Sequence, residues 1–333
     1  MNQMVRWSER IYDAYARLSE LPNVSLRKNE PLRDHTRFGI GGPADLMASV
    51  SDAAIFSNAL GVAQSSGLPW AVIGGGTNLV VSDEGFRGLI LKFTADGFRR
   101  RELTLDLDAG AVLQDAVDFS ISEGLRGLET MTGIPGWVGA AVYGNAGAYG
   151  HSISERITAV RFLDNGSLRE FDNAACEFRY RESAFKRRKE WIIIGCELAM
   201  TDAASGELAE IAREIRRVRD QKYPPTMRCA GSIFKNLLVA DLTPQVQAHV
   251  PEKIVREGKA PSAWFLEQAG AKGIRAGDIQ VATYHANLIF NDGAGTARDL
   301  VAVIRLLKRL VRERFDITLE EEVQYVGEFP PET

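Results

Sequence analysis

Two glycine-rich segments constrain the fold of this chain more than any other feature. The first follows an apolar, strand-like run and reads Gly74-Gly75-Gly76-Thr77-Asn78. Consecutive glycines let the backbone turn sharply and bring several N–H groups close to an anion, so this loop is a candidate phosphate site. A tight turn that binds nothing explains the same residues equally well.

The loop matches neither of two common phosphate-binding motifs. The dinucleotide fingerprint of the doubly wound fold requires glycine at position 79, where this chain has Leu79. The loop of nucleotide triphosphatases requires Gly-Lys-Ser/Thr, which does not follow here. A phosphate at this loop would therefore be bound by a different fold.

The second segment, GLETMTGIPGWVGAAVYGNAGAYG, places small residues at about every third position. Close packing of two backbones explains such a pattern when it stands alone. Together with the first loop it favours a dinucleotide, because one loop can cradle a pyrophosphate while the other lets a flat ring lie against backbone. Although residues 130–154 are uncharged, their many glycines make a poor membrane helix.

Composition excludes several classes of function. The chain has 333 residues, 45% of them hydrophobic and 25% charged, with a formal charge of -4, so neither nucleic acid nor a membrane is an expected partner. No obligate protein partner is evident. The scattered cysteines and histidines indicate free thiols and no metal site. The N-terminal segment carries charges throughout and is not a secretory signal, so we expect a cytoplasmic protein.

The order of predicted elements indicates alternating strands and helices followed by a region of different texture. The N-terminal helix has one apolar face, a polar connector covers residues 22–34, and Asp52 or Ser51 caps the next helix. Asn165-Gly166 between two alternating runs predicts a hairpin. A charged helix ends at Pro224-Pro225, where we place a domain boundary. Further helices are predicted in PSAWFLEQAG and TARDLVAVIRLLKRLVRERF, and the last strand in ITLEEEVQYVG.

Outside the glycine segments, the candidates for chemistry are Ser232, Arg181 and the acidic run of Glu320, Glu321 and Glu322. Ser232, in CAGSIFKN, could donate a proton, but capping is the commoner role of such a serine, and no Gly-x-Ser-x-Gly elbow surrounds it. Strand alternation would place Glu321 on one face and Glu320 and Glu322 on the other, although an acidic run is usually a solvated surface. Arg181 is one arginine among many. These residues alone indicate a cytoplasmic nucleotide-binding enzyme.

Seven motifs in order give a more specific expectation. IGGGTNLVVSDEGFRGLIL, GIPGWVGAAVYGNAGAYG, FRYRESAFK, GSIFKN, WFLEQAGAKG, HANLIFN and LEEEVQYVG resemble the UDP-N-acetylenolpyruvoylglucosamine reductase family, in its compact second type. The resemblance implies a flavoenzyme of peptidoglycan precursor synthesis with non-covalent FAD. It would use NADPH to reduce UDP-N-acetylglucosamine enolpyruvate to UDP-N-acetylmuramate.

The resemblance also implies an α+β architecture. We expect an FAD-binding fold of the vanillyl-alcohol-oxidase (PCMH) type with two α/β subdomains, plus a C-terminal α+β substrate-binding domain. The corresponding ranges are an N-terminal helical extension over residues 1–34, an FAD-binding domain over 35–221 that splits near 88, and a substrate-binding domain over 222–327. The C-terminal strand is expected to return towards the FAD site.

Site residues follow from the resemblance position by position. Ser232 would be the proton donor, Arg181 would stabilise the growing negative charge, and Glu322 would hydrogen-bond the carboxylate or orient the site. Asn236, Lys222 and Arg219 would face the substrate, whose two phosphates need cations. The residues expected to bind FAD are Gly74, Gly75, Gly76, Thr77, Asn78, Leu79, Gly133, Ile134, Pro135, Gly136, Gly139, Asn145, Gly147, Ala148 and Tyr149.

Two alternatives remain. One is another FAD-dependent oxidase of the same fold that acts on an alcohol or lactone, although many such enzymes tether the flavin through a histidine or cysteine, and the glycine segments contain neither. The other is a nucleotide-sugar sensor without turnover. The chain departs from the family at Leu237, where proline is usual, and it has no room between Cys196 and Lys222 for the tyrosine-bearing insertion of one subgroup.

Overall fold

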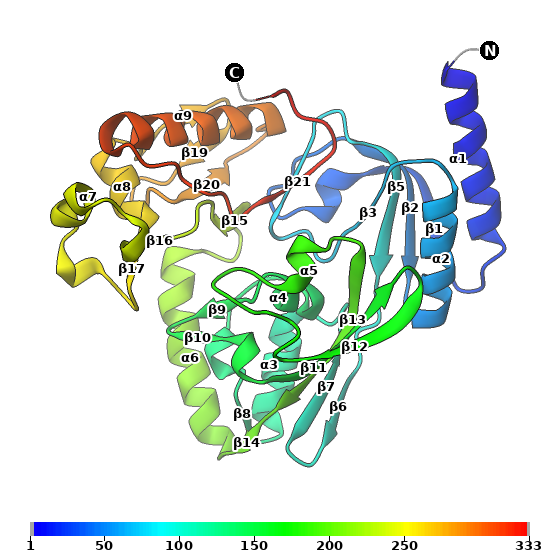
Figure 1. Cartoon of the computed structure of the whole chain (residues 1–333), viewed down its shortest axis with the longest axis horizontal. Helices are drawn as coiled ribbons and strands as arrows, with labels where there is room; N and C mark the ends of the chain where they lie inside the picture. Colours follow the sequence, from blue (N-terminus) through cyan, green and yellow to red (C-terminus); the bar gives the residue numbers. More distant parts are fainter. Residues whose placement is uncertain (1–2, 332–333) are drawn as a thin grey trace. The chain divides into compact units, whose positions relative to one another are not determined.

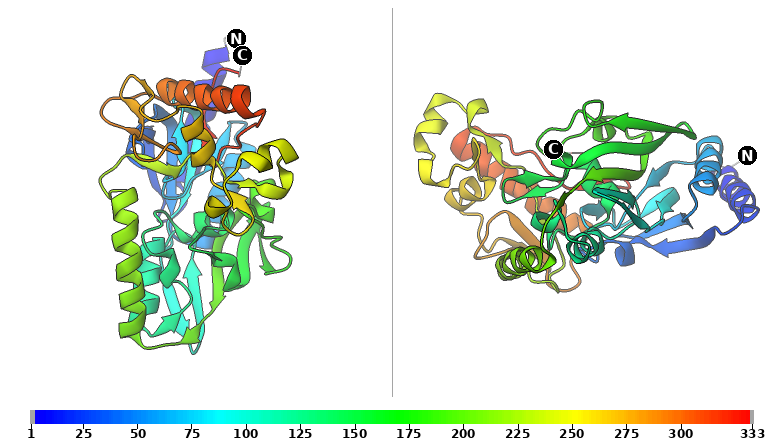
Figure 2. Two further views of the ribbon diagram at one scale, coloured as in Figure 1. Left: turned by 90° about the vertical axis from the view of Figure 1, so that its left-hand side faces the viewer. Right: turned by 90° about the horizontal axis from the view of Figure 1, so that it is seen from below.

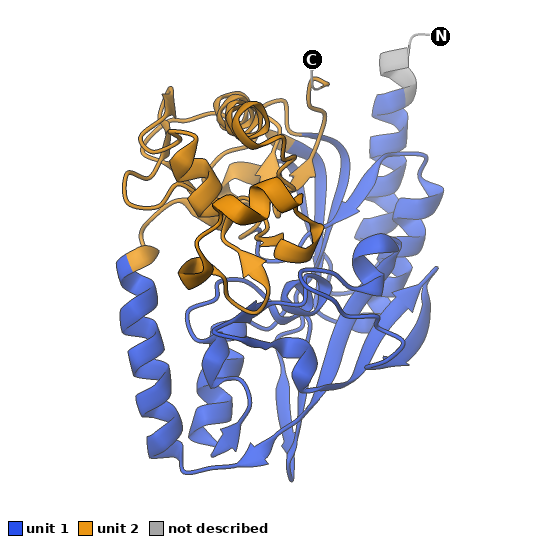
Figure 3. Cartoon of the chain, turned by 60° about the vertical axis from the view of Figure 1, so that its left-hand side comes forward, with its two compact units in different colours: residues 1–30, 44–76, 86–221 blue, residues 31–43, 77–85, 222–333 orange. Residues whose placement is uncertain are grey.

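The computed structural model describes residues 3–331, and for residues 3–6 the backbone only. The chain divides into two compact units, which Figure 3 shows in two colours. Unit 1 comprises residues 1–30, 44–76 and 86–221, and unit 2 comprises residues 31–43, 77–85 and 222–333. Each unit has its own hydrophobic core.

Unit 1 begins with a sheet whose strand order is β1 (Ser25–Pro31), β2 (Pro43–Val50), β5 (Phe86–Phe93) and β3 (Trp70–Val72). Strands β2 and β3 both run parallel to β5, which is the pairing expected when helices connect the strands. Helix α2 (Ala53–Ser65) begins at the predicted cap, because the Asp52 carboxylate accepts hydrogen bonds from two backbone N–H groups. The predicted connector over residues 22–34 is wrong, since β1 occupies most of it.

Helix α1 (Gln3–Ser19) lies beside α2 and is part of the core of unit 1 (Figures 1 and 2). The predicted apolar face is confirmed: Leu18 is fully buried, and Trp7, Ile11 and Tyr15 pack against the core. Helix α1 is therefore an integral layer of unit 1.

The second sheet of unit 1 is antiparallel and has the order β12 (Ser167–Asp172), β11 (Ile157–Asp164), β13 (Trp191–Ala199), β7 (Thr104–Asp108), β6 (Phe98–Arg101). The predicted hairpin is confirmed, with Asn165 and Gly166 both at positive φ. Helix α4 (Val138–Tyr143) packs on β13 and β7, and α3 (Leu113–Ser122) packs beside α4. The other elements are β8 (Leu125–Arg126) with β14 (Thr201–Asp202), β9 (Gly147–Ala148) with β10 (His151–Ser152), α5 (Ala184–Arg187) and α6 (Ser205–Lys222).

Unit 2 contains an antiparallel sheet of order β15 (Cys229–Ser232), β20 (Leu288–Asn291), β19 (Ile279–Val281), β18 (Arg275–Ala276). The two predicted helices are confirmed as α8 (Ser262–Gln268) and α9 (Ala297–Phe315). Helix α9 packs on β18 and β19 through its predicted apolar face, which is buried. Smaller elements are α7 (Pro244–His249) and the pair β16 (Leu237–Leu238) and β17 (Lys259–Ala260).

Two short segments of the predicted FAD-binding range, 35–43 and 77–85, belong to unit 2. The second contains β4 (Leu79–Val81), which pairs in parallel with β21 (Gln324–Val326). The two segments touch backbone to backbone: a Cβ on Gly42 would lie 2.2 Å from the Asp83 carbonyl oxygen, and one on Gly85 would lie 1.9 Å from that of Pro43. Only glycine permits so close an approach.

Asn291 ties residues 31–43 to the sheet of unit 2. Its side-chain amide donates to the carbonyl oxygen of Phe38 at 2.9 Å, and its side-chain oxygen accepts from the N–H groups of Gly293 and Gly295. Asn291→Ala leaves these buried groups without partners, so we expect a loss of about 2–3 kcal/mol in the free energy of unfolding. Urea unfolding followed by tryptophan fluorescence measures it.

Asn58→Ala is the matched control, because Asn58 is exposed on α2 and alanine favours helix there. Equal unfolding midpoints for the two variants would contradict the assignment.

Candidate functional site

The first glycine loop joins β3 of unit 1 to β4 of unit 2, and the chain passes from one unit to the other between Gly76 and Thr77. A Cβ on Gly74 would make only ordinary contacts, 3.8 Å from the Trp137 ring and 3.9 Å from Ala140. Gly74 also has no positive φ, unlike Gly76. The packing of unit 1 therefore does not require a glycine at position 74.

Trp137 brings the two glycine segments together within unit 1. A Cβ on Gly75 would lie 3.0 Å from the Trp137 ring, and the Lys92 ammonium lies 4.7 Å from the centroid of that ring. Burial lowers the pKa of Lys92, and the Glu30 carboxylate opposes part of that shift. Trp137 stands in the second glycine segment and Lys92 follows the first, but neither residue was expected to take part in the site.

The glycines of the second segment have several structural causes. Gly139, at the start of α4, donates to the Ala109 carbonyl oxygen, and a Cβ on it would lie 2.8 Å from the Ala109 side chain. Gly133 and Gly136 have positive φ, and a Cβ on Gly133 would lie 3.0 Å from the Arg219 side chain. The other residues expected to bind FAD here lie in unit 1, on the turn before α4 or on and around β9: Ile134, Pro135, Asn145, Gly147, Ala148 and Tyr149.

Arg181 is joined to this second segment. Its guanidinium donates to the carbonyl oxygen of Gly147 at 3.1 Å and, at the 3.5 Å limit, to that of Asn145. Arg181 and Asn145 both have a left-handed backbone, with φ of 56° and 42°. The Lys186 ammonium donates to the Arg181 carbonyl oxygen at 2.9 Å and pairs with Glu182, which fixes this strained turn.

In unit 2 the structure brings Ser232 and Glu322 onto adjacent backbone segments. The N–H of Glu322 donates to the Ile233 carbonyl oxygen at 2.7 Å, and Phe234 pairs with Glu321 in an antiparallel bridge. The Asn78 amide donates to the Glu322 carbonyl oxygen at 2.8 Å. Three predicted residues, one from the first glycine loop, therefore share one region of unit 2.

Two of the three consecutive glutamates, Glu320 and Glu321, have different side-chain partners. The predicted strand over residues 317–327 is wrong in length, because β21 covers only Gln324–Val326. Glu320 pairs with Lys235, whereas Glu321 pairs with Lys308 at 3.0 Å and accepts from the Tyr325 hydroxyl. The backbone of this segment is fixed by long-range partners, which a local pattern does not reveal.

The predicted substrate residues lie near the end of α6 and after β15. Arg219 is in unit 1 beside Gly133, and Lys222 is the first residue of unit 2. The Lys222 side chain is exposed, with its ammonium 5.1 Å from the centroid of the Tyr223 ring. Asn236 is exposed, and its side-chain oxygen accepts from the Ser262 N–H at 3.3 Å.

Tyr223 and His285 are further residues that the sequence analysis missed. The Tyr223 hydroxyl lies 3.2 Å from Ser232 Oγ, and the His285 ring lies edge-on to the Tyr223 ring. Burial lowers the pKa of His285 to about 4, with help from the positive charges of Lys222 and Lys272. No motif marks Tyr223, whereas His285 opens the motif HANLIFN, from which no role was expected for it.

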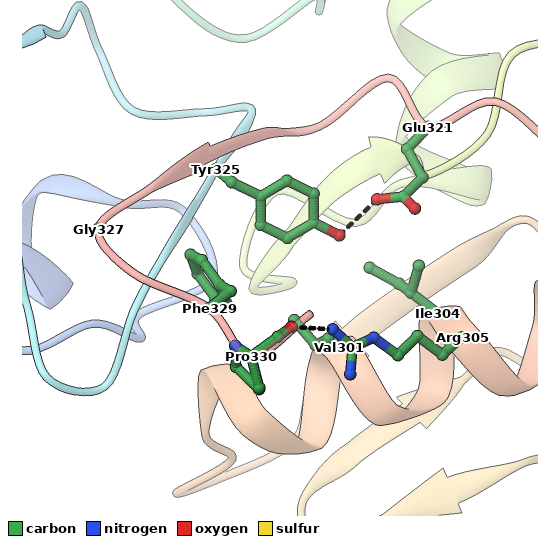
Figure 4. A pocket seen from close by; sticks show the side chains of 8 residues that line it. All are labelled: Val301, Ile304, Arg305, Glu321, Tyr325, Gly327, Phe329 and Pro330. Atoms are coloured by element: carbon green, nitrogen blue, oxygen red, sulfur yellow. Dashed lines mark hydrogen bonds between the residues drawn. The ribbon is translucent and has the colours of Figure 1, made fainter. Parts of the chain in front are cut away.

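A cavity of about 300 Å³ lies elsewhere in unit 2, between α9 and the C-terminal segment (Figure 4). It is lined by Val301, Ile304, Arg305, Glu321, Tyr325, Gly327, Phe329 and Pro330. Arg305 donates to the Pro330 carbonyl oxygen across it. None of its lining residues is a predicted site residue. Within residues 3–331, no cluster of three metal-ligating side chains occurs, and none of the helices combines the length and apolar character needed to cross a membrane.

Comparison with known proteins defines the class first. Residues 44–171 match the family described as "FAD binding domain", so unit 1 contains the fold of a flavoprotein. Residues 222–326 match the family described as "UDP-N-acetylenolpyruvoylglucosamine reductase, C-terminal domain". The predicted combination of an FAD-binding fold and a C-terminal α+β domain is confirmed.

Individual relatives agree over almost the whole chain. The chain is 59% identical to UDP-N-acetylenolpyruvoylglucosamine reductase of Solibacter usitatus, an alignment that covers 93% of this chain and 100% of the relative. It is 33% identical to the Bacillus licheniformis protein of that name, with 93% and 97% covered. The crystal structure of UDP-N-acetylenolpyruvylglucosamine reductase from Thermus caldophilus matches with a TM-score of 0.71 and 27% identity, covering 91% of this chain and 99% of that chain. The chain belongs to the UDP-N-acetylenolpyruvoylglucosamine reductase family.

The residues around the first glycine loop fit FAD. The space beside Gly74, where a Cβ would make only ordinary contacts, leaves room for a ligand to approach the backbone. Gly74→Ala should therefore leave the thermal stability of the apoprotein nearly unchanged and weaken FAD binding at least about tenfold, since one misplaced contact of about 1.4 kcal/mol suffices. Titration of the apoprotein with FAD, followed by flavin fluorescence, measures this.

Gly61→Ala is the matched control, because nothing lies within 4 Å of a Cβ there and the residue is in α2. If both variants bind FAD as tightly as the wild type, Gly74 does not line the cofactor site.

His285 makes stability depend on pH. Its pKa falls from 6.5 in the unfolded chain to about 4 in the folded protein, so the unfolded state binds the proton between these values. The contribution of His285 to stability is therefore fully present above about pH 6.5 and decreases by up to about 3 kcal/mol as the pH falls to 4. Urea midpoints at pH 7.5 and 4.5 should differ less for His285→Gln than for the wild type.

His249→Gln, at an exposed position, controls for the substitution. An unchanged pH dependence in His285→Gln would show that other groups cause the acid instability.

Proposed function

We propose that this chain catalyses the FAD-dependent reduction of UDP-N-acetylglucosamine enolpyruvate to UDP-N-acetylmuramate with NADPH, a step in peptidoglycan precursor synthesis. The observation that carries the proposal is the identity of 59% over the full length of a reductase of this name. Residues 44–171 and 222–326 also match an FAD-binding domain family and the C-terminal domain family of this reductase. The three cysteines are free thiols, which supports a cytoplasmic location.

The reaction adds a hydride to one carbon of the enolpyruvyl double bond and a proton to the other. FAD, when bound and reduced by NADPH, would supply the hydride. Ser232 supplies the proton: its Oγ–H bond breaks and a C–H bond forms at the substrate. Its place at the end of β15, with Glu322 on the neighbouring segment, supports this role.

Arg181 and Glu322 act on the substrate carboxylate. Hydride addition develops enolate-like negative charge there, and a guanidinium held rigid in advance stabilises it without reorganisation. Two sets of hydrogen bonds support such rigidity. The Arg181 guanidinium donates to the Gly147 and Asn145 carbonyl oxygens, and the Lys186 ammonium donates to the Arg181 carbonyl oxygen. Glu322 orients the carboxylate. Lys222 and Arg219 supply positive charge for the two phosphates, and Asn236 supplies hydrogen bonds.

Separating the two half-reactions tests the function. NADPH added anaerobically should bleach the yellow holoenzyme, and the enolpyruvyl substrate should then restore the colour. If FAD does not bind, or if only oxygen restores the colour, the proposed function is wrong; the second result favours an oxidase.

Ser232→Ala should leave bleaching by NADPH at the wild-type rate and slow reoxidation by the enolpyruvyl substrate about 100- to 10,000-fold, the contribution of a positioned proton donor. Stopped-flow absorbance of the flavin measures both rates. Ser122→Ala, at the exposed end of α3, is the control. Equal slowing of both half-reactions by Ser232→Ala would remove Ser232 from the role of proton donor.

A further inference from the structure

The Tyr223 hydroxyl, 3.2 Å from Ser232 Oγ, has no role in the chemistry described so far. Tyr223 directly follows the last residue of α6 and precedes Pro224-Pro225. It therefore reaches Ser232 from a different element than β15 or the segment that carries Glu322. The contact links the end of α6 to the proposed proton donor.

Packing fixes the Tyr223 ring in this position. The ring lies against a small core of Cys229, Ala282 and Leu288. Leu288 is the register partner of Ser232 in the pairing of β15 with β20, so the core that holds the ring also holds the strand of Ser232. The His285 ring packs edge-on against the Tyr223 ring, with 6.4 Å between centroids and 73° between planes.

The proposed proton transfer determines which of the two hydroxyl groups, Tyr223 or Ser232, donates the hydrogen bond between them. Either oxygen could donate at rest, but once the serine proton points at the substrate, Ser232 Oγ can only accept from Tyr223. As that proton leaves, Oγ gains negative charge, and an O–H···O⁻ bond is stronger than a neutral one.

We propose that Tyr223 is a positioning residue for proton transfer: it donates a hydrogen bond to Ser232 Oγ, aims the serine proton at the substrate and stabilises the oxygen as the proton departs. This inference rests on the proposed function of Ser232. The O–H bond of Tyr223 stays intact in this role, and Ser232 regains its proton from water before the next turnover.

Tyr223→Phe removes the hydroxyl and keeps the ring that packs on the core. We expect flavin reduction by NADPH at the wild-type rate, and reoxidation by the enolpyruvyl substrate slowed about 10- to 100-fold, the effect of losing one hydrogen bond to a charged oxygen. The solvent isotope effect on reoxidation in D₂O should increase, because proton transfer then limits the rate more strongly. A merely structural role would not produce that increase.

A double-mutant cycle decides whether Tyr223 acts through Ser232. In a Ser232→Ala background, Tyr223→Phe should have no further effect on reoxidation, because the group it positions is gone. Further slowing in that background, or equal slowing of both half-reactions by Tyr223→Phe alone, would overturn the inference. Tyr12→Phe, at an exposed position on α1, controls for the substitution.

The two proposals fail in different ways. If Ser232→Ala reoxidises at the wild-type rate, Ser232 is not the proton donor, and the role of Tyr223 is overturned with it. If Ser232→Ala is slow but Tyr223→Phe matches the wild type, only the inference on Tyr223 is wrong and the assignment of Ser232 stands.

Discussion

The arrangement of unit 2 depends on the segment from Glu320 to Val326. Two other backbone segments of unit 2 form hydrogen bonds with it, one on each side. On one side it bonds to residues 233–235, through the N–H of Glu322 and the N–H of Lys235. On the other, β21 pairs with β4, and the Asn78 amide adds a bond to the Glu322 carbonyl oxygen. Backbone bonds on both sides leave little freedom in where Glu322 lies, whatever the neighbouring side chains do.

Arg181 in unit 1 is held in place by side-chain hydrogen bonds that fix a left-handed backbone conformation. A left-handed backbone at a non-glycine residue costs about 1–3 kcal/mol and persists only when the surroundings over-determine it. Here the Lys186 ammonium binds the Arg181 carbonyl oxygen, and the Asn145 amide binds that of Arg179 at 2.9 Å. The Arg181 guanidinium also donates to two carbonyl oxygens of the second glycine segment. These hydrogen bonds hold the turn at Arg181 and the second glycine segment together as one rigid substructure.

Sequence reasoning was most accurate where the determining contacts are local. The Asp52 cap, the Asn165-Gly166 hairpin and the buried face of α9 each follow from residues a few positions apart. It failed where partners lie far away in the chain: β1 occupies a predicted connector, and residues 77–85 pack with residues after 222. Family motifs gave Ser232, Arg181 and Glu322 their specific roles, because local patterns alone favoured a cap, an ordinary arginine and a solvated acidic run. Tyr223 lies outside those motifs, and its contact with Ser232 exists only in the folded chain.

A glycine can be required by close packing within the protein or by the approach of a ligand. The structure distinguishes these two causes, which the sequence alone does not. Gly139 and Gly42 are explained by packing, since a Cβ would lie 2.8 Å from the Ala109 side chain in the first case and 2.2 Å from the Asp83 carbonyl oxygen in the second. Such glycines need no ligand to account for them. Gly74 differs, because a Cβ there would meet its nearest neighbour at 3.8 Å in a backbone conformation open to any residue. When the protein itself does not require the glycine, the close approach of a ligand becomes the stronger explanation, and in a chain with an FAD-binding domain we propose that this ligand is FAD.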